Sequence, residues 1–352
     1  MRRPLFRRAK RWGIIASAIL LSSLLLAACG ENSPSILNPA GPVAAKEAGI
    51  FWFILIVATI IFVIVEAALI YSIVRYRERP NSATPRQIHG SNTLEITWTV
   101  IPSVVLILVL GYTIYTMLTL YPGGANQLQV RVVAHQWWWE FDYPGYHIVT
   151  ADSMHIPAGT VVDAQLYSDN VIHSFWVPAL TGKLDVIPGH EMTNHLHFKA
   201  DASAANHSYP GECVEFCGAQ HAHMHFDVVV DTADNFNTWI SSQQQMALTP
   251  TGSLAAQGQK LFAQSSCAGC HGIVGVNLKS YDDPRAAGLV GPNLTHFGSR
   301  GLIAGGVLTN TPANLTTWLQ NPQAVKPGID MPQLGLSPDQ INALVAYLES
   351  LK

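Results

Sequence analysis

Two long apolar runs constrain the fold of this chain more than any other feature of its sequence. The runs Ile50 to Tyr71 and Trp98 to Leu120 are each long enough to cross a bilayer as a helix. The segment between them carries Arg75, Arg77, Arg79 and Arg86, and such basic loops stay on the cytoplasmic side. The sequence therefore predicts a transmembrane hairpin (about residues 50–74 and 98–120) with both ends outward, so that everything after Tyr121 lies outside the cytoplasm.

The first 28 residues predict export. A basic start is followed by an apolar stretch that ends in Leu26-Ala27-Ala28-Cys29, the order expected of a bacterial signal peptide. This ending resembles a lipoprotein box, which would make Cys29 the lipidated first residue of the mature chain, within an N-terminal segment and hairpin of residues 29–121. The alternative is an uncleaved anchor with an incidental cysteine. Cys29 has no other evident partner, which favours lipidation.

Charge is unevenly distributed along the chain. Residues 1–28 hold six of the 20 basic residues and none of the 23 acidic ones, so the rest of the chain carries a net charge of −9. A surface this acidic favours a basic partner protein and disfavours nucleic acid. The mean hydropathy of +0.21 comes from the N-terminal apolar runs, and the remainder has ordinary polarity.

The outer part predicts two domains of different class. Residues 122–240 contain short runs rich in valine and aromatic residues (127–134, 161–167, 171–177 and 225–230), separated by turn sequences, which is typical of a small β-sandwich or barrel. A short helix at 234–240 and a polar linker at 241–252 follow. Residues 253–352 show helical periodicity, clearest where a capping box at Ser337 precedes apolar residues spaced for one helix face. The sequence predicts a small all-α domain there.

One twelve-residue segment concentrates soft metal ligands. Two thiols four residues apart precede an imidazole and a thioether; the four side chains are Cys213, Cys217, His221 and Met224. Thiolate and thioether select copper in its lower oxidation state, and imidazole binds it in either state. Such a set on a β-sandwich indicates an electron-transfer copper site, and two bridging cysteines allow a binuclear one. The alternative is a disulfide beside a histidine-rich surface, which the spacing of His221 and Met224 disfavours.

The pattern C-x-E-x-C-x3-H-x2-M resembles the copper A motif of cytochrome c oxidase subunit II, over about residues 45–240. The resemblance implies a cupredoxin-like domain in which Cys213 and Cys217 bridge two coppers. His173, in a matching upstream segment, and Met224 would bind one copper, and His221 would bind the other. Glu215 would give its backbone carbonyl to that second copper and its side chain to a Mg²⁺ ion at the interface with the catalytic subunit.

Three further segments fit the resemblance. His135 to Trp139 resembles the aromatic patch of the family and implies that Trp137 is the point of electron entry; ordinary core tryptophans are the alternative. Residues 184–189 match the loop that faces the catalytic subunit, and Glu95 falls at the mouth of a proton channel.

Other polar residues do not follow the pattern. His190 replaces a common arginine, and Glu66, inside the first span, serves either a function or a helix–helix seam. The imidazoles of His223 and His225 leave the choice of His221 as local ligand open. Surface or packing roles are expected for the other histidines of the sandwich: His147, His155, His195, His197 and His207.

Cys267-Ala268-Gly269-Cys270-His271 is the C-x-x-C-H signature of covalent haem c attachment, in which the thiols add to the haem vinyls and His271 is the proximal iron ligand. Its surroundings resemble a class I cytochrome c, whose second axial ligand is a methionine before the last helix. This implies Met331 rather than Met246, which lies in the linker. Methionine–histidine ligation raises the reduction potential, as suits a donor to copper.

Together, the resemblances imply the electron-entry subunit of a respiratory haem–copper cytochrome c oxidase, multi-pass in a bacterial plasma membrane with both redox domains on the periplasmic side. Electrons would enter from cytochrome c or an upstream cytochrome complex, pass through haem c and binuclear copper A, and reach a catalytic subunit that reduces oxygen to water and pumps protons. Subunits I and III and membrane lipid are the expected partners. The alternatives are a nitric oxide reductase subunit, against which the tandem haem argues, and a copper-delivery lipoprotein. A quinol oxidase subunit is disfavoured because it lacks the copper cysteines.

Overall fold

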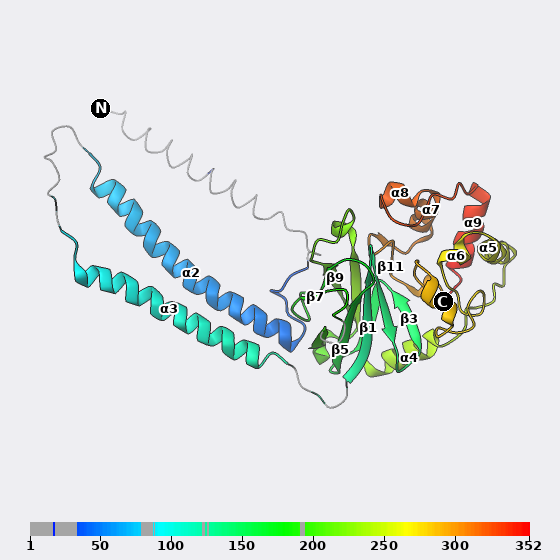
Figure 1. The fold of residues 1–352 in the computed structure, drawn as a ribbon, viewed down its shortest axis with the longest axis horizontal. Helices are drawn as coiled ribbons and strands as arrows, with labels where there is room; N and C mark the ends of the chain where they lie inside the picture. Colours follow the sequence, from blue (N-terminus) through cyan, green and yellow to red (C-terminus); the bar gives the residue numbers. More distant parts are fainter. Residues whose placement is uncertain are drawn as a thin grey trace. The chain divides into compact units, whose positions relative to one another are not determined.

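The computed structural model describes residue 17 and residues 34–78, 87, 89–121, 124, 127–190 and 194–352. The expected export signal, apart from residue 17, and Cys29 lie outside these residues, as do Arg79 and Arg86 of the basic loop. Figure 1 shows the two apolar runs as the long helices α2 (Pro42–Arg75) and α3 (Asn92–Leu118). By length and composition both helices can cross a membrane. Each begins before the apolar run that predicted it.

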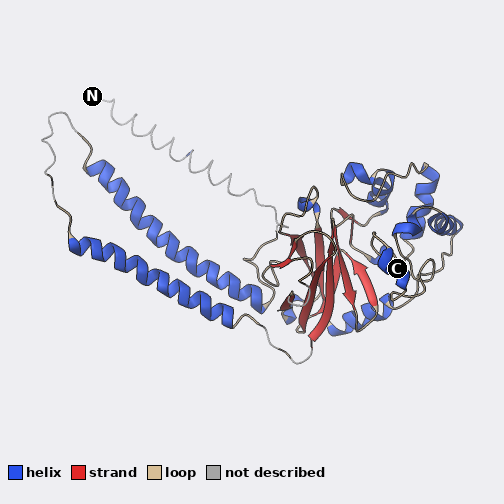
Figure 2. Cartoon of the chain, in the orientation of Figure 1, coloured by secondary structure: helices blue, strands red, loops and turns tan. Residues whose placement is uncertain are grey.

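The middle of the chain is a sandwich of two five-stranded sheets (Figure 2). The first sheet has the order β3-β2-β1-β5-β8, and its strands are Ile148–Ala151, Trp138–Tyr143, Gln127–His135, Val161–Ser168 and His195–Lys199. The second has the order β4-β10-β9-β6-β7, with strands Ser153–Pro157, His225–Asp231, His207–Cys213, His173–Trp176 and Leu184–Val186. In each sheet one pair, β1 with β5 or β4 with β10, is parallel. The β class predicted for this segment is confirmed.

Alternating burial along the strands explains why they form this sandwich. In β2 and β10 every second side chain is buried, so one face of each strand packs into the core. Trp139, Phe175 and Phe226 meet there, with ring centroids 4.7–5.6 Å apart. Trp139 is thus a core tryptophan. The strand expected at 171–177 is shorter as β6, because the Ser168 hydroxyl donates to the Val171 carbonyl and prolongs the preceding turn.

Residues 253–352 form the expected helical domain. Its helices are α5 (Ser253–Gln264), α6 (Cys267–Cys270), α7 (Pro312–Gln320), α8 (Pro322–Val325) and α9 (Pro338–Leu348), with a small hairpin of β11 (Leu302–Ile303) and β12 (Leu308–Thr309). At the start of α9 the Ser337 hydroxyl accepts from the Gln340 backbone N–H, and the Gln340 side chain accepts from the Ser337 N–H. This is the predicted capping box. Short 3₁₀ turns at 202–204, 221–223, 284–288 and 297–299 complete the fold.

The segment that connects the sandwich to the helical domain is held by hydrogen bonds. The helix expected at 234–240 is α4, which runs over Ala233–Gln243 and occupies the start of the segment expected as a linker. The Gln243 carbonyl accepts from the Tyr281 hydroxyl, and the Ala247 N–H donates to the Val274 carbonyl. The connecting segment therefore packs along the helical domain.

Candidate functional site

The soft ligands converge at the end of the second sheet. Cys213 is the last residue of β9, His173 is the first residue of β6, and the two strands pair side by side. The loop after β9 turns back so that Met224 lies directly before β10. The sheet thus brings together residues that are 40 positions apart in the chain.

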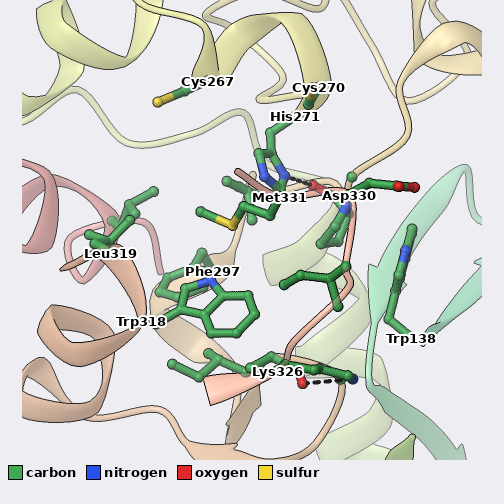
Figure 3. A pocket seen from close by; sticks show the side chains of 18 of the residues that line it. Trp138, Cys267, Cys270, His271, Phe297, Trp318, Leu319, Lys326, Asp330 and Met331 are labelled. Carbon is green, nitrogen blue, oxygen red and sulfur yellow. Dashed lines mark hydrogen bonds between the residues drawn. The ribbon is translucent and has the colours of Figure 1, made fainter. Parts of the chain in front are cut away.

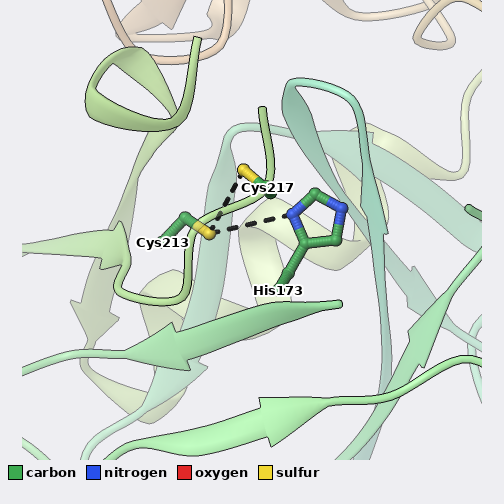
Figure 4. A group of neighbouring side chains, drawn as sticks. All are labelled: His173, Cys213 and Cys217. Carbon is green, nitrogen blue, oxygen red and sulfur yellow. Dashed lines mark hydrogen bonds between the residues drawn. The ribbon is translucent and has the colours of Figure 1, made fainter. Parts of the chain in front are cut away.

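The distances around the two thiols fit a shared metal site (Figure 4). The sulfurs of Cys213 and Cys217 lie 3.7 Å apart, and both thiols are free in the part of the chain that the structure describes. Cys213 Sγ is 3.7 Å from His173 Nδ1. On the other side, Cys217 Sγ lies 3.6 Å from the Nδ1 atom of His221 and 3.9 Å from the Met224 sulfur. This order agrees with two bridging sulfurs flanked by imidazole and thioether donors.

Burial and hydrogen bonding prepare the thiols for a cation. His173, Cys213, Cys217 and Met224 are at most 6% exposed. The hydrogen bond between the two thiols, together with the contact of Cys213 with His173, lowers the pKa of Cys213. The thiol–thiol bond also raises the pKa of Cys217. Binding of a positively charged metal would displace the thiol protons. Sulfur and imidazole donors in this number suit copper, so the residues present fit the group that the resemblance implies.

Three neighbours of the thiols take distinct positions. The Glu215 carbonyl oxygen lies 3.3 Å from Cys213 Sγ, while its residue is exposed to solvent. His223 Nδ1 bonds instead to the Gln220 side chain at 2.8 Å. His225 lies 3.9 Å from Glu212, and its N–H donates to the Gly305 carbonyl of the helical domain. Of His221, His223 and His225, His221 is the one whose ring lies beside a thiol. The sequence had left the choice among these three histidines open.

A second site is an apolar cavity in the helical domain. Figure 3 shows that Cys267, Cys270, His271 and Met331 lie around this cavity, and Phe297, Trp318 and Leu319 also line it. His271 Nδ1 bonds to the Pro292 carbonyl at 2.9 Å, which leaves Nε2 available. Burial lowers the pKa of His271, so the imidazole is kept neutral and can bind a metal.

Two further details fit a flat, anionic cofactor with a central metal. A Cβ at Gly291 would come 2.6 Å from the His271 ring, so the chain passes close over the imidazole there. Arg300 lines the same cavity, and its buried Nε atom has no hydrogen-bond partner among the described residues. A buried guanidinium with an unused donor suits a carboxylate such as a haem propionate. The residues present fit haem.

The two sites are joined by a tryptophan. Trp137 and Trp138 of the sandwich line the cavity that His271 and Met331 also line. The Trp137 Nε1–H donates to the Cys217 carbonyl at 2.9 Å, and the Gln136 side chain donates to the same oxygen at 2.7 Å. Trp137 therefore touches the thiol loop on one side and the cavity on the other.

A buried polar contact holds the two domains together beside Trp137. Lys326 of the helical domain is 2% exposed, and its Nζ donates to the carbonyls of Trp137 (2.6 Å) and Ala304 (3.0 Å). The buried carboxylate of Asp152 accepts from the backbone N–H groups of Trp139 and Gly305, both at 3.1 Å. Gly305 has φ +68°, and a Cβ there would lie 2.4 Å from the Trp137 carbonyl oxygen. We call Lys326, Asp152 and residues 304–305 the domain clasp.

Sequence reasoning did not single out the clasp or Arg300. Burial lowers the pKa of Lys326 to about 8, and it raises the pKa of Asp152, against the attraction of Lys326. A lone lysine and a lone aspartate in polar segments carry no sequence signal of burial. Two adjacent glycines, Gly305 and Gly306, were the one visible sign of a close contact.

Two predicted residues lie in or beside the membrane helices. Glu95 is exposed in the first turn of α3, and Glu66 lies in the middle of α2. Of the loop at 184–189, Leu184 to Val186 form β7, which pairs with the strand that starts at His173.

Comparison with known proteins identifies the three parts of the chain. The family model for the cytochrome c oxidase subunit II transmembrane domain matches residues 35–115, and the model for its periplasmic domain matches residues 150–233. The cytochrome c model matches residues 255–352. The two matches to subunit II imply copper A and an aqueous domain outside the cytoplasm, and the third implies haem.

Two relatives, both cytochrome c oxidase subunit 2 of bacteria, match this chain over almost their whole length. Cytochrome c oxidase subunit 2 of Alkalihalophilus pseudofirmus is 35% identical over 97% of this chain and 99% of its own. That of Bacillus subtilis is 35% identical over 97% of this chain and 98% of its own. Among solved structures, the periplasmic domain of subunit II of cytochrome oxidase from Bradyrhizobium japonicum is 28% identical, with a TM-score of 0.31 over 35% of this chain and 95% of that one. The chain belongs to the family of cytochrome c oxidase subunit II, and residues 255–352 are a cytochrome c domain.

Proposed function

We propose that this subunit carries electrons from its own haem c to a binuclear copper A centre and on to the catalytic subunit. Cys213 and Cys217 would bind both coppers, His173 and Met224 would bind one, and His221 with the Glu215 carbonyl would bind the other. The thiol-centred distances of 3.3–3.9 Å support one site built from these residues. The division of the ligands between the two coppers follows the family resemblance. Haem and copper would supply one-electron chemistry; the protein sets the distance and the medium between them.

Cys267 and Cys270 are proposed to hold the haem covalently, and His271 and Met331 would bind its iron. All four side chains line one cavity, and the bond from His271 Nδ1 to the Pro292 carbonyl fixes the ring orientation. The apolar lining excludes water, and the methionine–histidine pair favours a high reduction potential.

One observation carries the proposed route of transfer within the chain. Trp137 lines the haem cavity and donates a hydrogen bond to the backbone of Cys217. A single side chain thus spans the space between the two centres. Electron entry at Trp137 is therefore proposed to come from the chain's own haem, which takes electrons from cytochrome c or an upstream cytochrome complex.

The remaining roles concern the assembly. The exposed Glu215 residue is proposed to share a Mg²⁺ ion with subunit I, and the loop at 184–189 is proposed to face that subunit. Glu95 is proposed to lie at the mouth of a proton channel on the cytoplasmic side, since it precedes the second span. Subunit III and membrane lipid complete the proposed surroundings in a bacterial plasma membrane, with both redox domains on the outer side.

Electron paramagnetic resonance of the copper-loaded protein tests the copper assignment. The expected result is a seven-line mixed-valence signal that disappears in Cys217→Ser, because one thiolate cannot bridge the pair alone. Cys267→Ser is the matched control, since it removes a thiol from the haem site and leaves the copper signal in place. A mononuclear copper spectrum in the unaltered protein would contradict the proposal.

A further inference from the structure

Two histidines expected to be ordinary surface or packing residues form a third ligand cluster. His195 and His197 are two residues apart on β8, so their side chains share one face of the strand. Asp163 on β5 pairs directly with His197 across the antiparallel ladder. Side chains at directly opposed positions are close enough to bind one ion.

The two imidazoles converge on one carboxylate oxygen of Asp163. His195 Nδ1 lies 2.8 Å and His197 Nε2 lies 3.4 Å from the same Oδ1 atom of Asp163. The Asp163 side chain is 9% exposed, and the imidazoles are 34% and 26% exposed. The cluster thus combines a buried carboxylate with two imidazoles that solvent can reach.

The spacing of the donors is close to that of a metal polyhedron. One ligand atom from each side chain lies within 4.8 Å of the other two. In a tetrahedral zinc site with bonds near 2.1 Å, neighbouring donors are separated by about 3.4 Å. A cation would therefore need only a small opening of the Asp163–His195 contact. The Tyr121 ring packs edge-on against His197, with centroids 4.9 Å apart, and restricts its rotation.

The cluster is separate from the copper ligands. Asp163 and His195 belong to the first sheet, whereas Cys213 and His173 belong to the second. His197 also lines a small hollow with Val43 and Glu47 of α2, at the outer end of the membrane hairpin.

We propose that Asp163, His195 and His197 bind a divalent cation of borderline softness, Zn²⁺, with a fourth position open to water. Two imidazoles and one carboxylate form a common ligand set for this ion. The set lacks the sulfur that retains copper in its lower oxidation state, so the cluster and the thiol site differ in metal preference.

Calorimetric titration of Zn²⁺ into the copper- and haem-loaded protein tests the proposal, with metal content measured after gel filtration. We expect one zinc per chain beyond the resident metals. His195→Ala and Asp163→Asn should each weaken that binding by at least about tenfold, the scale on which even outer-shell partners of metal ligands act. Asp163→Asn preserves side-chain shape, so it remains informative where the alanine variant folds poorly.

His147→Ala is the matched control, because His147 forms an exposed pair with Asp282 (2.9 Å). It should leave zinc affinity unchanged. Equal zinc binding by His195→Ala and the unaltered protein would overturn the proposal, as would the absence of an additional zinc. Loss of the copper A absorption in step with zinc uptake would assign the ion to the thiols and also overturn it.

Discussion

Replacing Lys326 by methionine should loosen the contact between the haem and copper domains. The lysine ammonium donates to two buried carbonyls, those of Trp137 and Ala304. A hydrogen bond from a charged donor contributes about 1.5–3 kcal/mol. The two lost bonds together amount to about 3–6 kcal/mol. Methionine fills a similar volume and recovers some apolar burial, so the net loss should be at the lower end, about 3 kcal/mol. That loss lowers the ratio of docked to undocked domains about 100-fold.

Laser-initiated electron transfer from the haem to copper A measures this docking directly. The unaltered protein should show a single fast phase, since Trp137 already touches both sites. Lys326→Met should show a slower phase that depends on solvent viscosity, because transfer would then wait for the domains to redock. Haem and copper spectra recorded beforehand separate loss of docking from damage to either centre.

Lys260→Met provides the matched control. Lys260 lies exposed on α5 of the same domain, so the change removes an equal charge without touching the clasp. The control should transfer electrons at the unaltered rate. If Lys326→Met and Lys260→Met both retained a single fast phase, the clasp would contribute nothing to docking and the reasoning would be refuted.

Three further measurements test other parts of the structure. Trp137→Phe should slow haem-to-copper transfer at least tenfold with little change in either spectrum; an unaltered rate would place the path elsewhere. Met331→Leu should lower the haem midpoint potential by on the order of 0.1 V, measured by redox titration, because the axial sulfur is lost; an unchanged potential would exclude Met331 as ligand. Burial lowers the pKa of Lys326 to about 8, so between about pH 8 and 10.4 the unfolded chain binds more protons than the folded one and the free energy of unfolding rises with pH. The difference in thermal midpoint between the unaltered protein and Lys326→Met should therefore widen from pH 7 to 9.5, and a constant difference would contradict the burial of a charged lysine.

Features that depend on local spacing could be predicted from the amino-acid sequence. Apolar length alone predicted α2 and α3, and the Ser337 capping box predicted α9, because both signals act within a few turns of one helix. The thiols at 213 and 217 and the C-x-x-C-H motif at 267–271 named two chemistries, since ligands close in sequence are bound to be close in space.

Contacts between segments far apart in the chain depend on how the strands and domains pack in the folded protein. In the folded chain the His221 imidazole lies beside Cys217, whereas the His223 side chain bonds to Gln220 and the His225 side chain lies near Glu212. The domain clasp joins residues more than 150 positions apart, Asp152 with Gly305 and Trp137 with Lys326. Asp152 and Lys326 matter because they are buried, and a single charged residue in the sequence does not indicate burial. The Asp163 cluster likewise depends on the register of β5 and β8. Such contacts stabilise the protein only after the strands and domains have packed together. A local sequence pattern therefore cannot predict them.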